Sequence, residues 1–234
     1  MLGGGVDDDT ILVLLGPPGA GKGTQGDRLA GDLGIPKIAT GEVLRAAARE
    51  GTPLGREARG YMDRGELVPD SVILGIMKDT LAAPPAARGV ILDGVVRTVP
   101  QAEGLARLLS ELGRHLTGVI LFEVADEELV RRISARTVCD LCQTPYTGLS
   151  PGTACAKCGG SLVRRPDDEP DAVRNRLRVY KTQTAPVIAW YEAHEVPIFR
   201  IDAVGTPDEV ASRLRECLGD EAGDGGAAAR LRRR

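Results

Sequence analysis

The apolar positions of this chain gather in short, nearly continuous runs at residues 11–15, 90–93, 118–124 and 197–201, with a weaker run at 35–39. A strand that is buried on both faces needs no polar face, so such runs predict strands of a parallel sheet. Helical patterns occupy residues 22–33, about 100–112, 126–136, 170–193 and 207–218, between or after these runs. The alternation predicts an α/β fold with a doubly wound, parallel, five-stranded sheet and a ligand at the carboxyl ends of its strands.

Length, charge and hydropathy narrow the class of protein. The chain has 234 residues, 42% of them hydrophobic, which is enough for one large domain with insertions or for two small ones. A formal net charge of −3 argues against general nucleic-acid binding, so any anion site must be local. No apolar run approaches the length of a membrane span, and residues 1–9 lack the basic-then-apolar order of a leader. We therefore expect a cytoplasmic protein with no membrane or nucleic-acid partner, and disordered tails at 1–9 and 219–234.

The first apolar run leads into the sequence GPPGAGKGTQ at residues 16–25, which is typical of a phosphate-binding loop. Glycines allow successive backbone N–H groups to converge on one anion, a helix that begins at Lys22 adds its positive end, and the lysine ammonium reaches the outer phosphates. The alternative is a glycine-rich loop with a surface lysine. It is disfavoured because the chain has only five lysines against 25 arginines, and one of the five occupies the motif position.

Asp93 ends the run at 90–93, which would place a carboxylate beside the phosphate loop. A phosphate loop usually has Ser or Thr directly after its lysine to bind Mg²⁺, whereas this chain has Gly23 there and Thr24 one position later. We therefore expect phosphate oxygens and water to hold most of the Mg²⁺ shell, with Asp93 acting through water. The alternative is that Asp93 only caps the following turn.

Four cysteines form two CxxC pairs, Cys139 with Cys142 and Cys155 with Cys158, separated by twelve residues. Two such turns can place four thiolates tetrahedrally around one zinc ion, and a closed site of this kind is structural. Disulfides and a redox CxxC are the competing interpretations. Disulfides are disfavoured in a cytoplasmic protein, and two matching pairs inside a Pro/Gly-rich insert favour zinc.

Five separated segments, at 16–25, 40–45, 65–70, 93–102 and 164–168, resemble in order and spacing the signature segments of the adenylate kinases. From about residue 10 to 218, the chain resembles the long-lid bacterial type with a zinc knuckle. The resemblance implies reversible phosphoryl transfer, ATP + AMP = 2 ADP, by a monomer that uses Mg²⁺ with ATP and a structural Zn²⁺. It also implies a core at 10–38, 69–134 and 170–218, a helical arm for the nucleoside monophosphate (NMP) at 39–68, and a mobile lid at 135–169.

The same resemblance assigns site residues one by one. The residues assigned to bind the ATP phosphates are Gly19, Ala20, Gly21, Lys22, Gly23 and Thr24. Arg132 matches the position that stacks on the ATP adenine, and Arg136 matches an ATP phosphate contact. The residues assigned to bind AMP are Thr40, Arg45, Val68, Gly94, Arg97, Gln101, Arg165 and Arg176. The catalytic set is Lys22, Asp93, Arg97, Arg136, Arg165 and Arg176, while Asp167 and Asp168 match the pair that holds the lid hinge.

The many arginines suit phosphoryl transfer, because this reaction needs in-line positioning and charge stabilisation more than acid–base chemistry. The AMP phosphate is already an ionised nucleophile, so no catalytic histidine is required. A lid that excludes water would keep the enzyme from hydrolysing ATP, and a zinc-tied insert is suited to move as one rigid unit.

One segment departs from the family pattern, since the chain has Val95 and Val96 where the family has Phe-Pro before the arginine. This difference leaves two other functions open, a UMP/CMP or broad-specificity NMP kinase and a nucleotide-binding regulator with weakened catalysis. Thr40 favours an adenine acceptor, and the retained arginines favour catalysis over pure binding. A phosphate-loop ATPase coupled to nucleic acid is disfavoured by the acidic charge balance.

Overall fold

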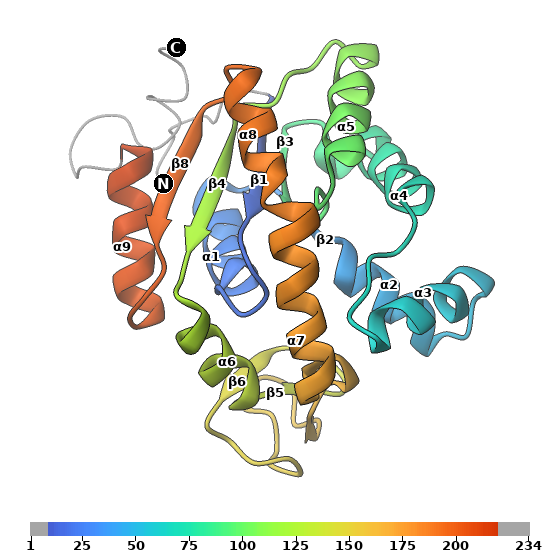
Figure 1. Ribbon diagram of the computed structural model, residues 1–234, viewed down its shortest axis with the longest axis vertical. Coiled ribbons are helices and arrows are strands. Elements are labelled where there is room, and N and C mark those ends of the chain that lie inside the picture. The colour runs from blue at the N-terminus through green and yellow to red at the C-terminus, as the bar shows by residue number, and fades with distance from the viewer. Residues whose placement is uncertain (1–8, 220–234) are drawn as a thin grey trace.

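The computed structural model describes residues 9–219, and its centre is a five-stranded parallel sheet in the order β2-β3-β1-β4-β8 (Figure 1). The strands are β1 (Thr10–Leu15), β2 (Lys37–Ala39), β3 (Gly89–Asp93), β4 (Gly118–Glu123) and β8 (Ile198–Asp202). Each coincides with one of the five apolar runs to within two residues, and every pairing in the sheet is parallel. The predicted fold class is therefore confirmed, with β1 at the centre of the sheet.

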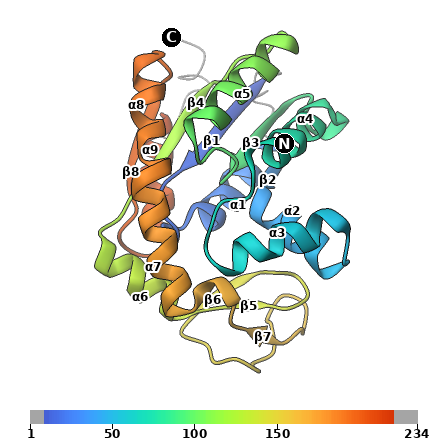
Figure 2. The same ribbon diagram turned by 45° about the vertical axis from the view of Figure 1, so that its right-hand side comes forward.

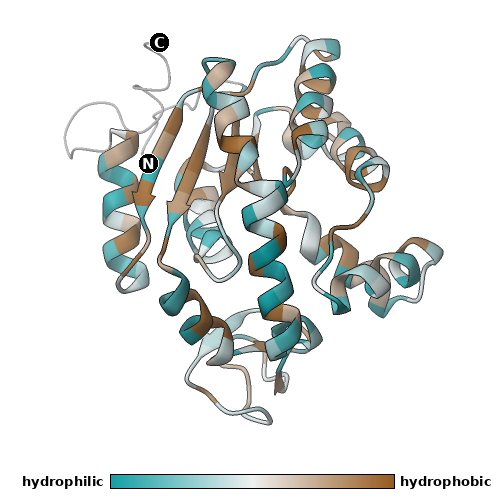
Figure 3. Cartoon of the chain, viewed as in Figure 1, coloured by the Kyte–Doolittle hydropathy of each residue, from teal (hydrophilic) through white to brown (hydrophobic). Residues whose placement is uncertain are grey.

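Successive residues of β1 point to opposite faces of the sheet and enter two separate hydrophobic cores. The helices that cover the two faces are α1 (Lys22–Leu33), α4 (Asp70–Ala82), α5 (Val99–Glu111), α6 (Asp126–Ser134), α8 (Pro186–Ala193) and α9 (Pro207–Leu218). Ile11, Val13 and Leu15 pack with α4, α5 and α8. Leu12 and Leu14 pack with α1, α6 and α9. In Figure 3 the strands are mostly brown, as expected of a sheet that is covered by helices on both faces.

The long helix predicted for 170–193 is present, but it contains a π-helical turn. Its first part, α7 (Pro170–Val179), continues through this turn (Tyr180–Thr184) into α8. Pro186 has no N–H to donate to a carbonyl one turn back, so the regular hydrogen-bond pattern is interrupted here. The Ala185 N–H bonds to the Tyr180 carbonyl oxygen at 2.8 Å, which closes the wider turn. Interruptions of this kind are frequent at functional sites.

Two further helices are α2 (Thr40–Arg49) and α3 (Pro53–Asp63), and the apolar periodicity singled out neither of them, nor α4. The Thr52 side chain caps α3 by accepting the Gly55 N–H at 3.0 Å. Figure 1 and Figure 2 both show this helix pair standing apart from the sheet, beside the carboxyl ends of the strands. The pair lies in the segment expected to bind the NMP. A short 3₁₀ turn, η1 (Pro84–Ala86), follows α4.

The cysteine-rich insert forms a small antiparallel sheet in the order β6-β5-β7. Its strands are β5 (Arg136–Cys139), β6 (Pro145–Thr147) and β7 (Leu162–Val163), and a 3₁₀ turn, η2 (Pro166–Asp168), leads on into α7 (Figure 2). The cluster of buried hydrophobic residues in the insert is small and is formed by Cys139, Cys155 and Leu162. Because three residues bury little apolar surface, the insert needs another source of stability.

Most of the two tails predicted at 1–9 and 219–234 lies outside the described residues. The described ends are ordered by local contacts: Asp9 pairs with Arg114, and Gly219 ends α9 in a left-handed conformation. Between residues 9 and 219, no helix combines the length and the apolar character that crossing a bilayer requires.

Candidate active site

The loop between β1 and α1 has the geometry of an anion cradle. Gly21 is the N-cap of α1 with a φ of 90°, a left-handed conformation that would strain a residue with a side chain. No side chain caps this helix, so its first N–H groups are available to a ligand. N–H groups at a helix N-terminus, together with the helix dipole, attract phosphate. Residues 19–24, which the sequence assigned to the ATP phosphates, form this turn.

The Lys22 side chain bends back into the loop that precedes it. Its Nζ donates to the Gly16 carbonyl oxygen at 2.7 Å and to the Pro17 carbonyl oxygen at 2.9 Å. Burial lowers the pKa of Lys22 to about 8, against the attraction of Asp93 and with the repulsion of Arg97. An anion in the loop would therefore stabilise the charged ammonium strongly.

Asp93 lies beside the start of α1, as the sequence predicted. It pairs in register with Leu14 of β1, and its Oδ2 is 3.5 Å from the point that a Cβ on Gly23 would occupy. Burial raises the pKa of Asp93, while Lys22 and Lys37 oppose this rise. A carboxylate beside a phosphate loop is the hard oxygen donor that Mg²⁺ prefers, so this residue fits the predicted cation.

Two aspartates of η2 hold two of the predicted arginines. Arg136 donates from Nε to Asp168 Oδ2 at 2.8 Å and from Nη2 to Asp168 Oδ1. Arg176 Nη1 lies 2.9 Å from Asp167 Oδ2 and 3.1 Å from Asp168 Oδ1. Burial alone would raise the pKa of Asp167, but Arg176 and Arg45 hold it below its usual value. The aspartate pair thus joins β5 of the insert to α7.

Arg45 and Arg165 each have a buried Nε that finds no hydrogen-bond acceptor in the described structure. Burial, together with repulsion from the nearby Arg45 and Arg136, lowers the pKa of Arg165 to about 9. Burial also lowers the pKa of Arg45. An unmet buried donor costs about 1–3 kcal/mol, and more when it is charged. Both guanidiniums would therefore be stabilised by an anionic ligand, and their planar donor sets match phosphate.

Two adjoining open pockets flank these groups, with about 580 and 520 Å³ of empty space that includes open solvent. The first, the arm pocket, is lined by Thr40, Leu44, Arg45, Val68, Val95 and Gln101, among others. The second, the loop pocket, is lined by Gly16, Pro18, Lys22, Val96, Tyr180 and Thr184, among others. The residues common to both linings are Gly65, Leu67, Gly94, Arg97 and Arg176. Ligands in the two pockets would therefore meet at two arginines.

The arm pocket brings together nearly all residues that the sequence assigned to AMP. Its lining includes Thr40, Arg45, Val68, Gly94, Arg97, Gln101 and Arg176, whereas Arg165 lies outside this lining. The Thr40 hydroxyl donates to the Gly94 carbonyl oxygen at 2.9 Å, which ties α2 to the loop after β3. Val95 lines the arm pocket and Val96 lines the loop pocket. Each pocket is therefore lined by one of the two residues that depart from the family pattern.

Arg132 is held away from both pocket linings. Its Nε donates to a glutamate one turn earlier on α6 at 2.7 Å, and its Nη2 donates to the Ala203 carbonyl oxygen at 2.9 Å. Its stacking on adenine stays a prediction. The sequence did not single out Asp70 and Thr98, which hold Gln101 from behind the arm pocket. Asp70 belongs to the segment at 65–70, but nothing in the local pattern shows its contact with a residue 31 positions later.

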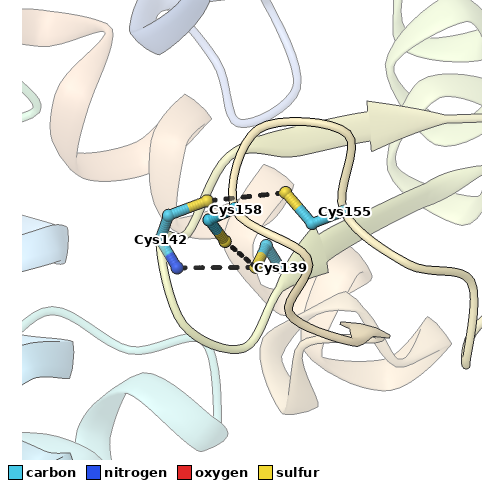
Figure 4. A group of neighbouring side chains, drawn as sticks. All are labelled: Cys139, Cys142, Cys155 and Cys158. Atoms are coloured by element: carbon cyan, nitrogen blue, oxygen red, sulfur yellow. Dashed lines mark hydrogen bonds between the residues drawn. The ribbon is translucent and has the colours of Figure 1, made fainter.

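The four cysteine Sγ atoms all lie within 4.8 Å of one another (Figure 4). The Sγ atoms of Cys139 and Cys158 are 3.4 Å apart, and those of Cys142 and Cys155 are 3.6 Å apart. Zinc–sulfur bonds of about 2.3 Å in a tetrahedron separate the sulfurs by about 3.8 Å, so the cluster fits Zn²⁺. These four cysteines form no disulfide. The predicted pairs therefore come together as a candidate structural zinc site.

A phosphate loop at the centre of a parallel sheet, together with arginines between two pockets, defines a P-loop phosphotransferase. Comparison with known proteins agrees with this class. A sequence model of the family described as adenylate kinase matches residues 14–196. The chain therefore belongs to the adenylate kinase family, which confirms the resemblance of the five segments, and it is a phosphotransferase.

Individual relatives match over most of the chain. An adenylate kinase of Gemmatimonas aurantiaca is 62% identical over 210 residues, which cover 89% of this chain and 98% of that protein. An adenylate kinase of Syntrophobacter fumaroxidans is 47% identical, with coverage of 89% and 99%. One of Methanosarcina barkeri is 44% identical, with coverage of 88% and 97%. The likeness thus extends across core, arm and insert.

Proposed function

We propose that the protein transfers the γ-phosphoryl group of ATP reversibly to AMP, giving two molecules of ADP. The main support for this proposal is that the two pockets share part of their lining, including Gly94, Arg97 and Arg176. Phosphoryl transfer requires two reactants in line and positive charge where they meet. The two pockets supply the alignment, and the two arginines supply the charge.

The ATP phosphates would lie in the loop at residues 19–24. Backbone N–H groups at the start of α1 would bind their non-bridging oxygens, and the Lys22 ammonium would exchange its two carbonyl partners for phosphate oxygens. Phosphate oxygens and water would hold most of the Mg²⁺ shell, with Asp93 acting through water. When bound, Mg²⁺ neutralises phosphate charge.

The AMP phosphate would be gripped by Arg45 and Arg97 through paired guanidinium hydrogen bonds. One of its oxygens attacks the γ-phosphorus of ATP, and the bond from that phosphorus to the β–γ bridging oxygen breaks. One ADP forms in the arm pocket and the other stays in the loop pocket. The attacking oxygen already carries charge, so no side chain has to accept a proton. Arg136, Arg165 and Arg176 would stabilise the charge on the equatorial oxygens.

We assign the core to residues 10–38, 69–134 and 170–218, the NMP arm to 39–68 and the lid to 135–169. The lid would close over ATP and exclude water, with Arg132 stacked on the adenine. The lid has only a small hydrophobic core. A structural Zn²⁺ bound by the four cysteines would stabilise it and would take no part in phosphoryl transfer. The protein would act on free nucleotides as a cytoplasmic monomer, without nucleic-acid or membrane partners, and its net charge of −3 argues against general nucleic-acid binding.

A competition assay tests the proposed function. The purified protein receives Mg-ATP and an equimolar mixture of AMP, GMP, CMP and UMP, and chromatography follows which monophosphate becomes a diphosphate. Selective conversion of AMP is the expected result. Preferential conversion of UMP or CMP would replace the proposal with a pyrimidine NMP kinase, and ATP binding without transfer would replace it with a regulator.

A further inference from the structure

The side-chain amide of Gln101 in the arm pocket has one fixed orientation. The Arg97 backbone N–H donates to Gln101 Oε1 at 2.7 Å, and Gln101 Nε2 donates to Asp70 Oδ1 at 2.7 Å. A backbone N–H can only donate, and an ionised carboxylate can only accept. The amide oxygen must therefore face Arg97 and the amide nitrogen must face Asp70. A flip of the amide would break both bonds at once.

Thr98 completes this arrangement behind the pocket. As the N-cap of α5, its hydroxyl oxygen accepts the Gln101 backbone N–H at 3.2 Å. The hydroxyl proton is then donated to Asp70 Oδ1, also at 3.2 Å. Gln101 lines the pocket and is 1% exposed, and Asp70 lies behind it as the first residue of α4. Asp70 therefore acts on the pocket through Gln101.

The held amide still has one N–H and one oxygen lone pair to offer a ligand. Purine bases differ in what they present at position 6, because adenine carries an amino donor there, whereas guanine and hypoxanthine carry a carbonyl acceptor. An amide oxygen at that position accepts from the amino group and repels the carbonyl, and a flipped amide would do the opposite. The orientation of one side chain can therefore decide which purine fits.

We propose that Asp70 is a positioning residue that locks the Gln101 amide and thereby makes the arm pocket prefer a 6-aminopurine monophosphate over a 6-oxopurine monophosphate. The inference rests on the proposed function, because it takes the arm pocket as the acceptor site. A hydrogen bond to a charged group is stronger than one between neutral groups. The lock therefore depends more on the Asp70 carboxylate than on the Arg97 N–H.

The test compares AMP with inosine monophosphate (IMP) as acceptors for Asp70→Ala, Asp70→Asn and a control, Asp79→Ala. Asp79 is exposed on the same helix, so the control removes the same charge from α4. The values of kcat and KM are measured for both acceptors at saturating Mg-ATP. The ratio of kcat/KM for AMP to that for IMP does not change with the folded fraction of enzyme, so a loss of stability alone cannot alter it.

We expect Asp70→Ala to lower the AMP:IMP ratio about tenfold, mainly through a higher KM for AMP, since a charged partner is lost. Asp70→Asn retains an acceptor oxygen and should give an intermediate ratio, and Asp79→Ala should match the wild type. An unchanged ratio in Asp70→Ala, even with both KM values raised, would overturn the inference, as would a wild type that prefers IMP. A wild type that phosphorylates neither acceptor would refute the proposed function and remove the inference with it.

Discussion

Replacing Arg176 with alanine is a direct test of the wall shared by the two pockets. The Arg176 guanidinium is held by Asp167 at 2.9 Å and by Asp168 at 3.1 Å, and 18% of its side chain is exposed. If it stabilises the charge that develops on the moving phosphoryl group, the substitution removes one preorganised donor. Such a loss lowers kcat about 100- to 1000-fold, or about 2.7–4 kcal/mol of transition-state stabilisation.

The effect of the same substitution on stability is smaller. Asp168 keeps its bidentate partner Arg136, and Asp167 keeps the attraction of Arg45 and Arg165. We therefore expect a loss of about 1–3 kcal/mol in the free energy of unfolding, below the 3–5 kcal/mol typical of a buried charge left alone. For a domain of this size that is a fall in Tm of about 2–12 °C. Unfolding at moderate temperature cannot then account for the loss of activity.

Initial rates at saturating ATP and AMP, from a coupled spectrophotometric assay for ADP, give kcat, and circular dichroism melts give Tm. Arg174→Ala is the matched control, because Arg174 lies on the same helix with 72% of its side chain exposed and pairs with the exposed Asp171. The control should retain the wild-type rate. If kcat of folded Arg176→Ala stayed within about fivefold of the wild type, far from the loss of a transition-state donor, the assigned role would be refuted.

Further predictions concern the cysteine cluster, Lys22 and the turn after α3. Cys142→Ser should lower thermal stability more than turnover at moderate temperature, because the cluster would stabilise a proposed lid that has only a small core. Melting curves give Tm, a colorimetric chelator measures bound zinc, and a large loss of kcat in a fully folded variant would contradict this. Burial sets the pKa of Lys22 at about 8, and bound phosphate favours the ammonium, so the free enzyme must take up a proton to bind ATP above that pH. The ATP dissociation constant should therefore be constant below about pH 7 and rise up to about tenfold per pH unit above about pH 8, and calorimetry in two buffers should detect proton uptake, whose absence would count against the prediction. Gly65 has a φ of 70°, and a Cβ there would lie 2.7 Å from a carbonyl oxygen of α7, so Gly65→Ala should cost about 1–3 kcal/mol and raise the KM for AMP. The control is Gly75→Ala on α4, where an added Cβ would meet no neighbouring atom. It should be neutral or stabilising by up to about 1 kcal/mol. Equal Tm values for the two variants would show that a Cβ at position 65 is not crowded by α7.

Much of the site could be predicted because its information is local. The strand β1, the loop and α1 follow one another directly, and the observed bounds of α1, Lys22–Leu33, coincide with the predicted helix. Glycines and a lysine at fixed spacing after an apolar run specify an anion cradle whatever surrounds it. The two CxxC pairs are similar, since each short turn keeps its own two cysteines close together and two contacts between the turns complete the cluster.

Other features depend on contacts between distant parts of the chain. The chain has 25 arginines, and periodicity does not indicate which of them lie together in the site. The family resemblance selected them. Packing then placed Arg97 and Arg176 in the linings of both pockets, whereas Arg132 donates to the Ala203 carbonyl oxygen. The same holds for the lock on Gln101, whose partner lies 31 residues earlier.

The amino-acid sequence by itself thus determined the strands of the sheet, the phosphate loop and the cysteine pairs, because each is specified by neighbours along the chain. Tertiary structure alone decided the order of the strands, the π turn before Pro186 and the partners of the buried charges. The physical reason is that a buried donor or charge is stabilised only by the acceptor or counter-charge that packing brings to it, and packing is a property of the whole fold.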